Sequence, residues 1–72
     1  METIKIKSSF GDNIECREFF DIVGSSEISG IEIFKSGRRL GSLLGVSIPD
    51  KNDNDEIEKF INEIDNWLID ND

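Results

Sequence analysis

The fold is decided by residues 55–69, which read DEIEKFINEIDNWLI. Apolar side chains recur there at steps of three and four residues, which is the spacing of one face of an α-helix. These side chains belong to Ile57, Phe60, Ile61, Ile64, Trp67 and Leu68. Because an apolar helix face must be buried against another layer, the pattern predicts an amphipathic helix over about residues 54–70 that packs on the rest of the chain.

Two residue pairs could cap the start of this helix, Asp53 with Glu56 and Asp55 with Glu58. In either pair the first side chain accepts hydrogen bonds from the backbone of the first turn, and the acid three residues later reaches back. Acids in the first turn also suit the positive end of the helix dipole. The sequence predicts where the helix starts without choosing between the two pairs.

The N-terminal segment predicts a strand followed by a turn. Residues 3–9 place Ile4 and Ile6 on one side and lysines on the other, which is the period of two of a half-buried strand. Positions 11–13 then hold glycine, aspartate and asparagine. These residue types tolerate left-handed backbone angles and predict a turn.

Residues 14–23 fit two different structures. As a strand, Ile14, Cys16 and Phe20 share one face, and the segment completes a hairpin with the preceding strand. As a helix, the apolar residues from Cys16 to Val23 form a stripe at helical spacing. We favour the strand, but the sequence leaves both structures open.

A second hairpin is predicted from residues 31–35 and 38–48, joined by the two-residue turn Ser36-Gly37. Pro49 ends its second strand, because proline has no N–H to donate to a ladder. Before this hairpin, residues 24–30 contain three serines and two glycines. That composition predicts a connector with room for one helical turn.

These elements together predict an α+β fold. It consists of an antiparallel sheet of two β-hairpins, with three or four strands over about residues 2–49, and the C-terminal amphipathic helix packed on one face. A chain of 72 residues has room for one core, so residues 1–72 are expected to form a single small domain.

Acidic side chains are concentrated at the C-terminal end of the chain. Residues 50–72 hold nine of the sixteen acids and only two lysines, whereas residues 1–49 hold seven acids against six bases. A negative surface held on a helix attracts basic partners and repels nucleic acid. We therefore expect a basic nucleic-acid-binding protein as partner, and no direct binding of nucleic acid.

The candidate partner-binding residues on the helix are the acids expected to face solvent: Glu56, Glu58, Glu63, Asp65 and Asp70. Three of them, Glu56, Glu63 and Asp70, recur every seven residues, which spaces them about 10 Å apart along the helix. Asp70 also lies where the helix dipole prefers a cation, at a cost of about 0.3–1 kcal/mol. An uncompensated local cost of this kind points to function. The alternative is that the acids only keep a small domain soluble.

Two apolar residues form a second candidate surface. Phe34 and Leu43 are out of phase with Ile31 and Ile33, so we expect them on the sheet face that the helix leaves uncovered. There they would form an interface with another chain, including a second copy of this one. The alternative is that residues 24–30 fold over that face.

The sequence predicts no catalytic, cofactor or metal site and no enzyme. Cys16 is a lone cysteine in a chain without histidine, so it lacks both a disulfide partner and the usual base, and we expect it in the core. The segment from Asp50 resembles a calcium loop at three positions but has Asp55 where glycine is needed and Ile61 where the bidentate glutamate belongs. No apolar run approaches a membrane span or a signal peptide, so a cytoplasmic protein is expected.

In size, sign of charge and plan, the chain is similar to small phage-encoded inhibitors, such as acidic anti-CRISPR proteins and the inhibitor of uracil-DNA glycosylase. The similarity is one of type, and no motif carries residues over from a particular family. It implies a non-enzymatic inhibitor that presents a nucleic-acid-like negative surface to a basic site on a nucleic-acid-processing protein. The alternative is a small structural or regulatory subunit, homodimeric, whose acidity serves only solubility.

Overall fold

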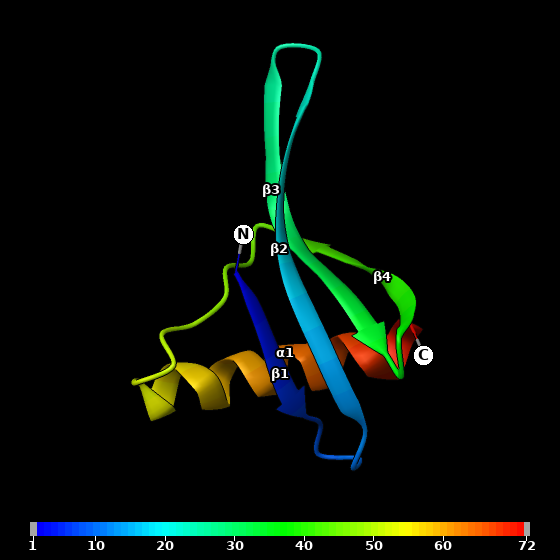
Figure 1. Ribbon diagram of the computed structural model, residues 1–72, viewed down its shortest axis with the longest axis vertical. Coiled ribbons are helices and arrows are strands. Elements are labelled where there is room, and N and C mark those ends of the chain that lie inside the picture. The colour runs from blue at the N-terminus through cyan, green and yellow to red at the C-terminus, as the bar shows by residue number, and fades with distance from the viewer. Residues whose placement is uncertain (1, 72) are drawn as a thin grey trace.

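The computed structural model describes residues 2–71 of the chain. Four strands come first, β1 (Thr3–Lys7), β2 (Asn13–Val23), β3 (Ser26–Lys35) and β4 (Arg38–Leu44), and one helix follows, α1 (Asn54–Asn71). The strands pair in sequence order as an antiparallel sheet, and α1 runs across one of its faces (Figure 1). The predicted α+β fold, with its C-terminal helix, is confirmed.

Residues 14–23 form a strand, so the helical alternative for this segment is wrong. Ile14 and Cys16 pair with β1 on one side, and Cys16 lies opposite Ile33 of β3 on the other. Both side chains are buried. A strand with partners on both edges satisfies its backbone hydrogen bonds and also buries these two side chains on one face.

The predicted connector over residues 24–30 is also wrong. The only residues between β2 and β3 are Gly24 and Ser25, and β3 begins at Ser26. Gly24 has a φ of 64°, a left-handed angle that suits glycine in a tight turn. The sheet is therefore a continuous meander of three hairpins, where the sequence predicted two separate ones.

The core lies between α1 and the covered face of the sheet. The helix contributes Phe60, Ile64 and Leu68, all buried, with Ile61 and Trp67 packed against them. The remaining buried apolar side chains come from the strands and from the segment before the helix: Ile4, Ile6, Ile14, Cys16, Ile31, Ile33 and Ile48. The predicted packing of the apolar helix face on the sheet is thus confirmed.

A β-bulge in β4 changes which residues of that strand face the core. Ile33 pairs with Gly41 whereas Phe34 pairs with Arg39, so Leu40 is an extra residue. One extra residue reverses the alternation beyond it. Leu43 therefore lies opposite the buried Ile31 and packs against the core. The prediction that Leu43 lies on the uncovered face is wrong.

The start of α1 is capped by Asp53. Its Oδ1 atom accepts hydrogen bonds from the backbone N–H of Asp55 at 3.1 Å and of Glu56 at 3.2 Å. Of the two predicted caps, the structure therefore uses the first. At the other end the last turn contains no base, and the Asn71 side chain donates to the Trp67 carbonyl at 2.9 Å.

The central hairpin extends well beyond the rest of the sheet. The β1 pairing stops at Arg17 of β2, and the β4 pairing stops at Gly30 of β3. Residues 19–29, which we call the arm, therefore form a two-stranded ribbon (Figure 1). The arm projects from the rest of the described chain, residues 2–18 and 30–71, which we call the body. The arm lies along the longest dimension of the molecule, 39 Å.

Candidate interaction surfaces

Three helix acids form a row along one side of α1. Glu56, Glu63 and Asp70 are all exposed. Because seven residues are close to two helical turns, these side chains follow one line at steps of about 10 Å. We call them the acidic row. The helix beneath is held by its buried face, so the row projects from a fixed backbone.

The acidic row borders an open groove. The groove lies between α1 and residues 45–50, has a volume of about 640 Å³, and is lined by acids from both sides: Asp50, Asp53, Glu56 and Glu63. Among the described residues that line it, Lys59 is the one base. A concave surface lined mostly by one sign of charge strengthens the local field and attracts a partner of the opposite sign.

Glu58 lies away from the acidic row. It is exposed, but two residues along an α-helix rotate a side chain by about 200°, so it projects from the other side of α1 than Glu56. The five predicted acids therefore do not share one face. Glu58 lies instead on the same side of α1 as Asp65, because the two residues are seven positions apart.

Asp65 is not a solvent-facing residue, so that prediction is wrong. Its exposed fraction is 8%. Its carboxylate accepts hydrogen bonds from the Ser9 backbone N–H, at 3.1 Å, and from the Ser9 hydroxyl. Ser8 holds the same loop from within, because its hydroxyl accepts from the backbone N–H of Phe10 and Asp12. Asp65 thus fixes the β1–β2 loop to the helix and is unavailable to a partner.

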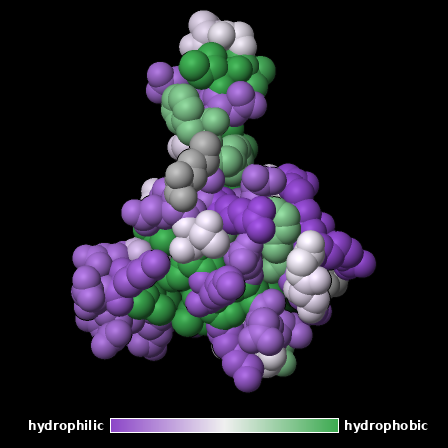
Figure 2. All heavy atoms as spheres, viewed as in Figure 1, coloured by the Kyte–Doolittle hydropathy of each residue, from purple (hydrophilic) through white to green (hydrophobic). Residues whose placement is uncertain are grey.

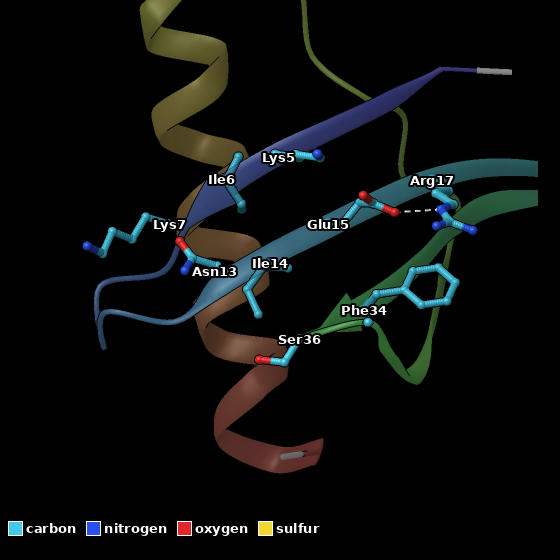
Figure 3. A pocket seen from close by; sticks show the side chains of 10 residues that line it. Lys5, Ile6, Lys7, Asn13, Ile14, Glu15, Arg17, Phe34 and Ser36 are labelled. Atoms are coloured by element: carbon cyan, nitrogen blue, oxygen red, sulfur yellow. Dashed lines mark hydrogen bonds and ion pairs between the residues drawn. The ribbon is translucent and has the colours of Figure 1, made fainter.

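Phe34 lies on the uncovered sheet face, as predicted, but it is not a free apolar surface. Its ring is half-buried under the Arg17 guanidinium, 4.4 Å from the ring centroid. The Arg17 Nε atom also donates to Glu15 at 2.6 Å (Figure 3). Since Leu43 faces the core, the two residues of the predicted apolar interface lie on opposite faces of the sheet.

The uncovered face holds a shallow hollow of about 570 Å³ (Figure 3). Its charged lining residues are Lys5, Lys7 and Arg17 against Glu15. Both lysines belong to β1, an edge strand, where lysine prevents pairing with other chains. The hollow is therefore opposite in charge to the acidic row, and its charges have a structural explanation.

Cys16 is a core residue, as predicted, and its side chain is fully buried. Burial, assisted by the nearby Glu15 charge, raises the pKa of its thiol to about 12. This shift disfavours the thiolate form, which is the nucleophilic one. Within residues 2–71, no three Cys, Asp or Glu side chains gather where they could hold a metal ion. No helix in that range has the length and apolar character to cross a membrane.

The exposed apolar side chains of the arm are not among the residues predicted from the sequence. Phe20 is 53% exposed, Ile22 60% and Val23 57%. The space-filling view shows hydrophobic side chains at this projecting end (Figure 2). A signal was present in the sequence, because residues 18–29 contain three acids, several large apolar residues and no lysine or arginine.

A comparison with known proteins finds no matching family model, no similar curated protein and no similar solved structure.

Proposed function

We propose that this protein is a non-enzymatic inhibitor whose acidic row binds a basic site on a nucleic-acid-processing protein. The observation that carries the proposal is the row itself, in which Glu56, Glu63 and Asp70 are exposed along one side of a helix fixed by its core. A site that binds the phosphate backbone is lined with lysine and arginine. Regularly spaced carboxylates on a fixed helix present to such a site a pattern of negative charge similar to that of phosphates.

The position of Asp70 supports a binding role for the row. The last turn of α1 contains no base, although the negative end of the helix dipole favours one. An acid there opposes stability, whereas a basic partner would gain from it. The proposed compartment is the cytoplasm, in keeping with a lone thiol.

The homodimer alternative rests on the uncovered sheet face. Of the two apolar residues predicted there, Leu43 packs against the core and Phe34 is half-buried under Arg17, so this face offers a second copy less apolar surface than the sequence predicts. We therefore retain a heterologous basic partner as the proposal.

The test is affinity capture from a nuclease-treated extract of the source cells, at about 50 and about 500 mM NaCl, followed by kinetics with the purified partner. The variant is Glu63→Gln/Asp70→Asn, and the matched control is Asp55→Asn/Glu58→Gln. Each removes two charges from the same helix, but only the first touches the acidic row. We expect slower association for the first variant alone, and competition by the partner's own nucleic acid.

Two results would overturn the proposal. One is a captured partner that binds nucleic acid and this protein at the same time. The other is equal association rates for the two double variants, because that would make the position of the charges irrelevant.

A further inference from the structure

We propose that the arm enters the partner's groove, and that this groove is one that holds single-stranded nucleic acid. This inference rests on the proposed function and extends it from the acidic row to the projecting hairpin. Grooves for single strands combine basic walls with aromatic side chains on which bases stack. The partner is therefore expected to offer both positive charge and an apolar floor.

The exposure of the arm is the first observation. Phe20, Ile22 and Val23 are each more than half exposed. A ribbon of two strands has no third strand and no helix to cover these side chains, and such a ribbon is marginally stable by itself. Solubility explains acids on a surface, but it does not explain three large apolar side chains exposed within residues 20–23 of one strand.

The charge of the arm is the second observation. Residues 19–29 contain Asp21 and Glu27 and no base. The arm therefore combines apolar side chains with negative charge, as a single strand of nucleic acid combines bases with phosphates. The same combination argues against a second copy of this chain as the occupant, because two arms would bring acids together and each chain has a formal charge of −8.

The third observation is that the arm and the acidic row belong to one continuous surface. Phe20 lies on the same face of β2 as the buried Cys16, which is the face toward α1. A notch at the base of the arm is lined by Phe20, Val46 and Ser47. Val46 and Ser47 also line the acidic groove beside α1. One partner can therefore contact the arm and the acidic row together.

The test places a photo-crosslinking amino acid, p-benzoyl-phenylalanine, at position 22 of the full chain, in the nuclease-treated extract used above. The crosslinked peptide of the partner is identified by mass spectrometry. The competitors are oligothymidylate of about 25 nucleotides and a blunt duplex of the same length. We expect the adduct to map to a single-strand-binding groove and to be suppressed by the oligothymidylate more than by the duplex.

Two matched pairs of variants measure the energetic role of the arm with the purified partner. Phe20→Ser is compared with Phe10→Ser, because Phe10 is 59% exposed in the β1–β2 loop, away from the arm. Ile22→Ser is compared with Ile69→Ser, because Ile69 is 67% exposed on α1. We expect each arm variant to weaken binding by about tenfold or more through faster dissociation, and each control by less than about twofold.

The outcomes separate this inference from the proposed function. If Glu63→Gln/Asp70→Asn slows association but both arm variants bind as tightly as their controls, the acidic row stands and the arm inference is overturned. An adduct at a duplex-binding surface, or one suppressed equally by both competitors, also overturns it. Self-association at about 500 mM NaCl that is abolished by Ile22→Ser would assign the arm to a second copy and overturn it too.

Discussion

The two halves of β2 have opposite environments, and the more apolar half is the more exposed one. The first half is paired on both edges and covered by α1, and Cys16 within it has an exposed fraction of 0%. The second half belongs to the arm, is paired on one edge, and leaves Ile22 60% exposed. Apolar content does not explain this difference, because residues 19–23 hold four apolar side chains and residues 13–17 hold two. A strand is buried here when other elements cover it. The arm is exposed because β1, β4 and α1 do not extend alongside residues 19–29.

We expect contacts within the body to supply nearly all of the free energy of folding. The substitution with the largest expected loss of stability is Phe60→Ala. Phe60 is 4% exposed in the core between α1 and the sheet. Removing a buried phenylalanine ring costs about 3–5 kcal/mol, which is comparable with the whole stability of a small domain. We expect the variant to be largely unfolded at 25 °C, as measured by circular dichroism and thermal melting.

The matched control is Phe20→Ala in the arm, where the same ring is 53% exposed. We expect its melting temperature to stay close to that of the unchanged protein. Equal destabilisation by the two substitutions would break the distinction between body and arm.

Much of the body could be predicted from the sequence, because its signals are local. The spacing of Ile57, Phe60 and Ile64 predicts the helix and its buried face, and Ser36-Gly37 predicts the turn between β3 and β4. Ser36 and Gly37 both have positive φ, 52° and 80°, as a tight hairpin turn requires. These features depend on residues close together in the chain.

The predictions that are wrong concern features set by contacts between residues far apart in the chain. Residues 26–30 have few strand-forming side chains, yet they extend β3 because β2 lies beside them. The sheet face on which Leu43 lies depends on the extra residue Leu40. The alternation of apolar residues in the sequence does not reveal that extra residue. The prediction of the candidate site was wrong at Asp65 for a similar reason, because its carboxylate is hydrogen-bonded to Ser9, 56 residues earlier in the chain.

Asp65 gives the next largest expected effect, because it joins the β1–β2 loop to the helix. Asp65→Ala leaves the Ser9 donors without their acceptor in a part-buried site, at an expected cost of about 1–3 kcal/mol. The measurement is urea denaturation of Asp65→Ala, Ser9→Ala and the double variant. We expect the double variant to be less destabilised than the sum of the single ones. Strict additivity would mean that the two side chains do not interact.

Asp70 is expected to act in the opposite direction. Asp70→Lys places a cation in a last turn that contains no base and should raise stability by up to about 1 kcal/mol through the helix dipole. The proposed function requires the same change to weaken binding of the basic partner. A variant that is more stable and binds unchanged would favour an acidity that serves only solubility, and a variant that is less stable would contradict the dipole argument.

The smallest expected effect on stability is in the arm, and it gives the clearest contrast between the arm and the body. Ile22→Ser changes a side chain that is 60% exposed, and substitutions at such positions usually alter stability by less than about 0.5 kcal/mol. We expect the measurement, urea denaturation, to show this small change.

Hydrogen exchange tests the same difference in stability between arm and body. The amides of residues 19–29 are held by one neighbouring strand and should exchange through local opening, whereas those of residues 14–17 should exchange only when the whole domain unfolds. If the arm amides are as protected as those of Ile14 and Cys16 in the free protein at low concentration, the arm is as stable as the body, and its exposed side chains would be part of a rigid preformed surface. If they are unprotected alone and become protected when the partner is added, the arm is ordered by binding, and part of the binding free energy is then used to order it.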